Sequence, residues 1–132
     1  MIKRREELKK ETILNLKSGD GKIDLINILS IEEMEENGRL FAVNVVPPGC
    51  SIGSHLHNGD FETYYIIRGM AEVNDCGHIC EVNPGDVVIC KNGSFHGIRN
   101  IGEEDLEYIA LILYSKKETD ASAVSEGEAA TE

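Results

Sequence analysis

The sequence predicts an all-β fold of the sandwich or jelly-roll type. About nine short apolar segments follow one another at intervals of about 8–12 residues, and Gly, Pro or Asn turns separate them. Hydrophobic residues make up 41% of the chain and aromatic residues only 5%, which suits an aliphatic, β-branched core. The 132 residues are enough for one domain that buries most of its unfolded surface.

The N-terminal part predicts an arm followed by the first strand. Residues 3–12 have strong helix propensity but few apolar side chains, so we expect a short surface helix or an irregular arm within residues 1–21. After the turn at 18–21, residues 22–29 alternate with Ile23 and Leu25 on one side, which predicts a strand.

The next segments predict a single helical turn and then a long strand. Ser30 and Glu33 fit a capping box, and the short helix that they begin should end at Asn37-Gly38. Residues 39–46 are mostly apolar and stop at Pro47-Pro48, which predicts a strand.

The remaining chain predicts further short strands and a tail. Residues 63–67 and 87–89 are apolar on both faces, so both strands should be buried. Other strands are expected at 69–73, 78–82 and 106–114 and after the turn at 92–93. The predicted barrel is 22–114, and 115–132 should be a disordered acidic tail because it has almost no large apolar residues.

The charge balance argues against nucleic acid as a partner. Acidic residues number 24 against 13 basic ones, a formal net charge of −11, whereas phosphate recognition needs a basic stripe. No apolar run approaches the roughly 20 residues of a membrane span, and residues 1–7 are charged with no apolar stretch behind them. We therefore expect a cytoplasmic protein without a membrane partner, in which the four cysteines are reduced.

The central stretch 49–69 carries three side chains of metal-ligand type, His55, His57 and Glu62. In a strand, alternate side chains share a face, so both histidines should point the same way. Asn58-Gly59 favours a tight reversal, and a returning strand would bring Glu62 alongside the two imidazoles. His96, from the segment 85–100, is the candidate fourth ligand.

These residues resemble the two motifs of the cupin family. The first motif is matched at Gly49, His55, His57, Glu62 and Gly69, and the second at Gly85, Gly93, His96 and Asn100. One position departs, because Lys91 stands where the family usually has Pro, and Asn92-Gly93 can form the turn without it. The resemblance implies a jelly-roll barrel, usually a homodimer, with His55, His57, Glu62 and His96 as ligands of one divalent transition metal (Mn, Fe, Ni, Co or Zn).

Other polar and sulfur side chains receive simpler interpretations. An isolated pair of histidines two residues apart seldom binds metal, and only the full set at family spacing favours a site. His78 lies in a turn and should be solvated. The four cysteines lack the spacing of a zinc knuckle, so we interpret them as small hydrophobic residues.

Strand phase predicts the pocket wall, with Tyr64 and Ile66 on the face of Glu62 and Ile98 on the face of His96. Tyr64 is a candidate proton donor to a metal-bound substrate, although a simple barrel-lining role is the alternative. Arg68 has the same phase but should be a solvated cation at the rim, and Tyr108 is a weaker lining candidate. The pocket should then lack positive charge, which disfavours di-acids such as oxalate.

Two hypotheses about function stay open. The first is a small metalloenzyme that acts on an oxygen-bearing metabolite able to chelate the metal, by dioxygenase, isomerase, lyase or decarboxylase chemistry. The second is a metal-containing binding or sensor module without turnover. Because four protein ligands leave about two octahedral positions open, the enzyme is favoured. Glu62 argues against thiol dioxygenases of this fold, which use three histidines alone, and fold does not choose among the rest.

Overall fold

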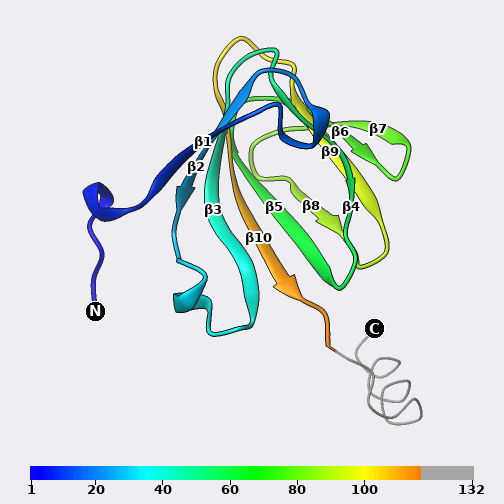
Figure 1. Cartoon of the computed structure of the whole chain (residues 1–132). Coiled ribbons are helices and arrows are strands. Elements are labelled where there is room, and N and C mark those ends of the chain that lie inside the picture. Colours follow the sequence, from blue (N-terminus) through cyan, green and yellow to red (C-terminus); the bar gives the residue numbers. More distant parts are fainter. Residues whose placement is uncertain (117–132) are drawn as a thin grey trace, which may run out of the picture.

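The computed structural model describes residues 1–116, and Figure 1 shows them as two antiparallel sheets. Within the described residues there are ten strands and three short 3-10 turns. The strands are β1 (Lys10–Leu14), β2 (Lys22–Asn27), β3 (Gly38–Val46), β4 (Ser51–Leu56), β5 (Asp60–Arg68), β6 (Ala71–Asp75), β7 (His78–Val82), β8 (Val87–Cys90), β9 (Phe95–Asn100) and β10 (Leu106–Tyr114). The turns are η1 (Arg5–Glu7), η2 (Leu16–Ser18) and η3 (Glu32–Met34).

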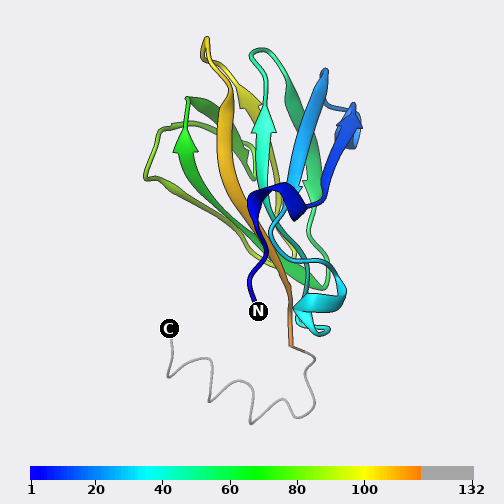
Figure 2. The ribbon, with the colours of Figure 1, turned by 90° about the vertical axis from the view of Figure 1, so that its left-hand side faces the viewer.

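The strand order confirms the predicted jelly-roll architecture. One sheet has the order β1-β2-β3-β10-β5-β8 and the other β4-β9-β6-β7. In Figure 2, β10 runs through the middle of the larger sheet and β1 lies at its edge. Alternate residues of each sheet face the space between them, so this space contains the core and, at one end, the predicted ligands.

The core is aliphatic, with two tyrosines at its centre. Tyr64 and Tyr108 are both almost completely buried, and their ring centroids lie 4.5 Å apart. Around them pack aliphatic side chains from both sheets, among them Ile23, Val46, Ile66, Val73, Ile98 and Leu106.

The N-terminal segment differs from the prediction of a short helix or an irregular arm over residues 3–12. Only η1 is helical, and Lys10–Leu14 forms strand β1, which pairs antiparallel with β2. Residues 10–12 are Lys, Glu and Thr, without the apolar alternation that indicates a strand. The ladder to β2 therefore overrides the local helix propensity.

The capping box predicted at Ser30 is confirmed. The backbone N–H of Glu33 donates to Ser30 Oγ over 3.1 Å, and the backbone N–H of Ser30 donates to Glu33 Oε1 over 2.9 Å. The resulting turn, η3, precedes β3.

The reversal at Asn58-Gly59 occurs where predicted, but it does not form a hairpin. Strand β4 pairs with β9 in the smaller sheet, while β5 pairs with β10 and β8 in the larger one. The turn therefore crosses from one sheet to the other, with Gly59 at a φ of +86°. It is held to the second Asn-Gly turn, because the Gly59 N–H donates to Asn92 Oδ1 and the Gly93 N–H to the His57 carbonyl.

Two strands predicted to be buried on both faces are half exposed. Val87 and Ile89 of β8 are 54% and 57% exposed, and Tyr65 and Ile67 of β5 are 48% and 45% exposed. Their outer faces are exposed because side chains alternate along a strand and the larger sheet packs on the smaller one through its inner face. The predicted tail at 115–132 lies almost wholly outside the described residues.

Candidate metal centre

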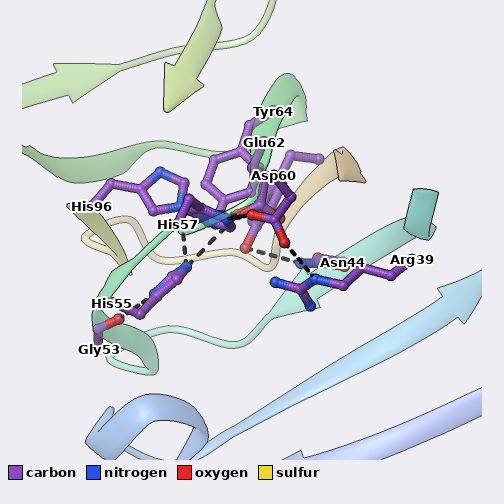
Figure 3. Close-up of polar contacts among 10 residues, drawn as sticks. Arg39, Asn44, Gly53, His55, His57, Asp60, Glu62, Tyr64 and His96 are labelled. Carbon is purple, nitrogen blue, oxygen red and sulfur yellow. Dashed lines mark hydrogen bonds and ion pairs between the residues drawn. The ribbon is translucent and has the colours of Figure 1, made fainter. Parts of the chain in front are cut away.

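Four side chains meet between the two sheets: His55, His57, Glu62 and His96 (Figure 3). One ligand atom from each lies within 4.8 Å of the other three. Among the described residues, this is the group of histidine, cysteine and acidic side chains that is suited to a metal ion. The convergence predicted from the sequence is therefore present in the fold.

Strand register and the crossing turn bring the four side chains together. His55 on β4 is the direct partner of His96 on β9 in the smaller sheet, and His57 follows the end of β4. Glu62 lies on β5 of the opposite sheet. The turn at 58–59 carries the chain from one sheet to the other, so the carboxylate faces the three imidazoles across the barrel.

Two of the imidazoles are fixed by hydrogen bonds on their outer side. Because a carbonyl and a carboxylate oxygen accept, His55 Nδ1 donates to the Gly53 carbonyl over 2.8 Å and His57 Nδ1 donates to Asp60 Oδ1 over 2.7 Å. In the neutral rings, this leaves the Nε2 lone pairs facing inward, toward the other ligands. Hydrogen bonds of this kind orient metal-binding histidines and fix their tautomer.

The inward-facing nitrogens lie so close together that their lone pairs repel, and a cation bound among them would remove this repulsion. His96 Nε2 lies 3.1 Å from His55 Nε2 and 3.2 Å from His57 Nε2, and it lies 2.9 Å from Glu62 Oε1. Lone pairs and a carboxylate at such distances repel unless a proton or a metal ion lies among them. The donor set of three imidazoles and one carboxylate therefore fits one divalent first-row metal.

The carboxylates of the site are held in their charged form. Burial tends to raise the pKa of Glu62, but in the absence of metal the three histidines around it, once an Nε2 atom among them is protonated, keep that pKa far below its ordinary value. The Glu62 carboxylate in turn raises the pKa of His57, against the effect of burial. Even without metal, the site therefore favours a positive charge at its centre.

Asp60 and Arg39 extend the site, and sequence reasoning missed both. Arg39 Nε donates to Asp60 Oδ2 over 2.7 Å, so the guanidinium supports the carboxylate that fixes His57 (Figure 3). Burial tends to raise the pKa of Asp60, but the bonds from Arg39 and His57 lower it overall. Asp60 follows His57 by three residues and could have been recognised as its partner, whereas Arg39 comes from β3.

Tyr64 lies beside the ligands, as its strand phase predicts. Its hydroxyl oxygen is 3.4 Å from His96 Nε2, and its ring stacks on the His96 ring with centroids 5.0 Å apart. Burial, and then the Glu62 charge, raise the pKa of Tyr64 well above its ordinary value. The phenol is therefore neutral and able to donate a hydrogen bond at any physiological pH. This agrees with both predicted roles of Tyr64, as a proton donor and as a barrel-lining residue.

The other candidates lie away from the cluster. Ile66 and Ile98 belong to the core, and Tyr108 packs behind Tyr64 and accepts a hydrogen bond from Asn44. Arg68 forms an ion pair with Glu107 at the end of β5. His78 is exposed.

The cysteines are free and none belongs to the cluster. Cys90 is buried, which raises the pKa of its thiol to about 11. Cys50 is half-buried and packs against the core, as expected for a small hydrophobic residue, whereas Cys76 and Cys80 are exposed.

A cavity of about 200 Å³ opens beside the ligands, and its charge differs from the prediction. The expectation of a pocket without positive charge is wrong, since Lys17 and Arg39 both line it. These two cations lie on η2 and β3. Strand phase within the motif strands predicts only which of their own side chains face the pocket, so it does not predict lining residues from other elements. The objection to acidic ligands that rested on this expectation is therefore removed.

None of the helices in residues 1–116 has the length and apolar character that crossing a membrane requires.

Comparison with known proteins identifies relatives over most of the chain. The family model of the cupin domain matches residues 42–112. An oxalate-binding protein of Thermotoga maritima is 40% identical over 113 residues, which cover 86% of this chain and 93% of the relative. The crystal structure of a predicted oxalate decarboxylase from the same species matches with a TM-score of 0.83 and 39% identity, over 87% of this chain and all of that one.

A more distant relative is a 5-nitrosalicylic acid 1,2-dioxygenase of Bradyrhizobium. It is 30% identical over 84 residues, which are 60% of this chain but only 40% of the relative. The similarity to this enzyme therefore covers less than half of its length.

Proposed function

Because the chain belongs to the cupin family, we propose that it binds one divalent transition metal and uses it to capture a small chelating carboxylate. The observation that carries this proposal is the convergence of His55, His57, Glu62 and His96, three of which line a cavity that Lys17 and Arg39 also line.

The metal would supply a Lewis-acidic centre with room for a ligand. Four protein donors leave about two positions free in an octahedral shell, as a site that binds an exogenous ligand requires. Imidazole and carboxylate donors suit Mn, Fe, Ni, Co or Zn, and the donor set does not choose among these metals.

Two independent features favour a carboxylate as the ligand. Lys17 places positive charge at the cavity of a protein whose net charge is −11, and Arg39 lines the same cavity although its guanidinium is paired with Asp60. The relative that is 40% identical is named for binding oxalate. A carboxylate bound to the metal would thus lie near positive charge, whereas the rest of this acidic molecule would repel it.

Elemental analysis tests the metal site. Protein purified without chelator should contain about one divalent ion per chain, and His96→Ala should lose most of it because an imidazole donor is removed. His78→Ala is the matched control, since His78 is exposed and lies outside the cluster. Folded wild-type protein that takes up no metal, even from supplemented medium, would contradict the proposal.

Calorimetry tests the ligand. Oxalate should bind to manganese-loaded protein and not to protein held in chelator. Oxalate binding of equal strength with and without metal would contradict the proposed role of the metal.

Turnover is a second candidate function, and Tyr64 is the observation that favours it. A neutral phenol next to the ligands can donate a proton to a bound substrate, as the general acid of a decarboxylase or lyase would. Tyr64→Phe should then lower kcat about 100-fold while metal content stays at the wild-type level. If metal-loaded protein leaves oxalate and other chelating acids unchanged, the binding function alone remains.

We also propose a homodimer in the cytoplasm. The apolar outer faces of β5 and β8 are exposed in the single chain, which favours a partner surface there. The four cysteines are free, and the reducing cytoplasm would keep them so.

A further inference from the structure

The cavity beside the ligands has a polar floor and an aliphatic wall. Three of the predicted ligands, His55, His57 and Glu62, line the floor. The wall is formed by six aliphatic side chains, Ile13, Leu16, Leu25, Leu40, Ile52 and Ile112. A ligand made only of carboxylate groups would leave these aliphatic side chains in contact with water or with polar atoms. An apolar group on the ligand would gain affinity by covering it.

The size of the cavity allows such a group. Its volume is about 200 Å³. An apolar protein cavity of about 150 Å³ is large enough to hold benzene. The space beside the ligands can therefore hold a chelating head together with a branched or cyclic body of several carbons.

We propose that the cavity selects chelating carboxylates that carry an apolar body of about four to six carbons. The carboxylate is the group that binds at the metal site beside Lys17, and the body packs on the aliphatic wall. This inference rests on the proposed function, since it names the class of acid that the same metal site captures.

A homologous series of acids tests the apolar body. Glycolate, lactate, 2-hydroxybutyrate and 2-hydroxy-4-methylpentanoate share one chelating head and differ only in the body. Calorimetry with manganese-loaded protein should find affinity rising about fourfold for each added carbon until the cavity is filled. Affinities that stay flat or fall along the series would overturn the assignment of the wall.

A pair of variants checks that the gain comes from the wall. Leu16 lines the cavity, whereas Leu14, two residues earlier, is 71% exposed and does not. Leu16→Ser should lower the affinity for 2-hydroxy-4-methylpentanoate about fivefold more than that for glycolate. Leu14→Ser should keep the wild-type dependence on body size. A loss of this dependence in both variants, or in neither, would contradict the proposed contact.

Oxalate separates this inference from the proposed function. Metal-dependent binding of oxalate that is tighter than binding of every hydroxy acid would leave the proposed function standing and overturn the inference. Failure of metal-loaded protein to bind oxalate or any acid of the series would overturn both.

Discussion

Glu62 is the one negatively charged donor among four proposed ligands, and this gives it a separate role from the histidines. Its carboxylate faces three imidazoles and is almost completely buried. Replacing it with glutamine keeps an oxygen donor and nearly the same shape but removes the charge that balances the ion.

We predict that Glu62→Gln lowers metal affinity by about 10–100-fold, the range measured when a partner in a metal shell is lost. Titration of chelator-stripped protein with manganese, followed by calorimetry, measures the change. Glu81→Gln is a suitable control, because Glu81 is exposed on β7. If Glu62→Gln bound manganese as tightly as wild type, Glu62 would not be a ligand, and the site would resemble the three-histidine dioxygenases.

Asp60 makes the stability of the metal-free protein depend on pH in a defined direction. The pKa of Asp60 in the folded protein lies below the ordinary value of 3.8, because bonds from Arg39 and His57 outweigh burial. The charged carboxylate therefore stabilises the fold above about pH 4, and this contribution is lost as the pH falls through the lower folded value.

Asp60→Asn should accordingly lose stability at pH 7 and become less sensitive to acid between about pH 4 and pH 2. Urea unfolding of chelator-treated protein at several pH values measures both effects. If the free energy of unfolding fell by the same amount in Asp60→Asn and in wild type over this pH range, the Asp60 charge would contribute nothing to stability.

At the residue scale, spacing together with the resemblance to the two cupin motifs was enough to predict which four side chains converge, His96 included, but not their surroundings. His55, His57 and Glu62 lie within eight residues, so strand phase and one turn bring them together. Arg39 and Lys17 reach the same cavity from β3 and η2, and only the sheet order brings those elements near. The sign of the charge in the pocket therefore could not be predicted from the motif strands.

At the scale of elements, the turn η2 is packed tightly on β4, and its residues Leu16 and Lys17 line the cavity. A Cβ atom added at Gly53 would lie 1.9 Å from the Lys17 carbonyl oxygen, so no side chain fits there. Gly53 also accepts the hydrogen bond from His55. This one glycine thus links the position of the turn to the orientation of a predicted ligand.

We predict that Gly53→Ala lowers the free energy of unfolding by about 1–3 kcal/mol, as is typical when a substitution forces backbone to move. Gly102→Ala is the matched control, because its added Cβ would lie 3.6 Å or more from every neighbour. Denaturant unfolding compares the two variants. Equal stability of both would contradict the close packing of η2 on β4.

Strand identity was easier to predict than strand environment. Periodicity and turn residues located β2, β3 and the strands after them. β1 was missed because Lys10, Glu11 and Thr12 show no apolar alternation, and its pairing with β2 is a long-range effect. At 87–89 only Val88 is buried in the single chain, because side chains alternate along the strand and an apolar run does not reveal that one face of the sheet is uncovered.

At the scale of the whole molecule, the fold does not depend on the metal for its core. The buried cluster is formed by aliphatic side chains and two tyrosines from both sheets, while the predicted ligands occupy one end of the barrel. In chelator, wild type and Glu62→Gln should both unfold in a single cooperative thermal transition. Calorimetry that found no transition for chelator-treated wild type would indicate that the metal is part of the folding core, as in zinc fingers.

The last prediction concerns the assembly of the chain and is based on the outer faces of β5 and β8. Tyr65 and Val87 are direct partners in the ladder, and Ile67 and Ile89 lie on the same face as these partners. All four are about half exposed, so they form an apolar strip along one edge of the larger sheet. A second copy related by a two-fold axis would cover the strip with the same strip of its own.

We expect sedimentation at micromolar concentration to find a dimer, and Ile89→Lys to convert it to a monomer, because two buried lysines would face each other across the axis. Ile79→Lys is the matched control, since Ile79 is 59% exposed but lies on β7 of the other sheet. It should leave the dimer intact. A monomeric wild type would contradict the proposed dimer, and a dimer that survives Ile89→Lys but not Ile79→Lys would move the interface to the smaller sheet.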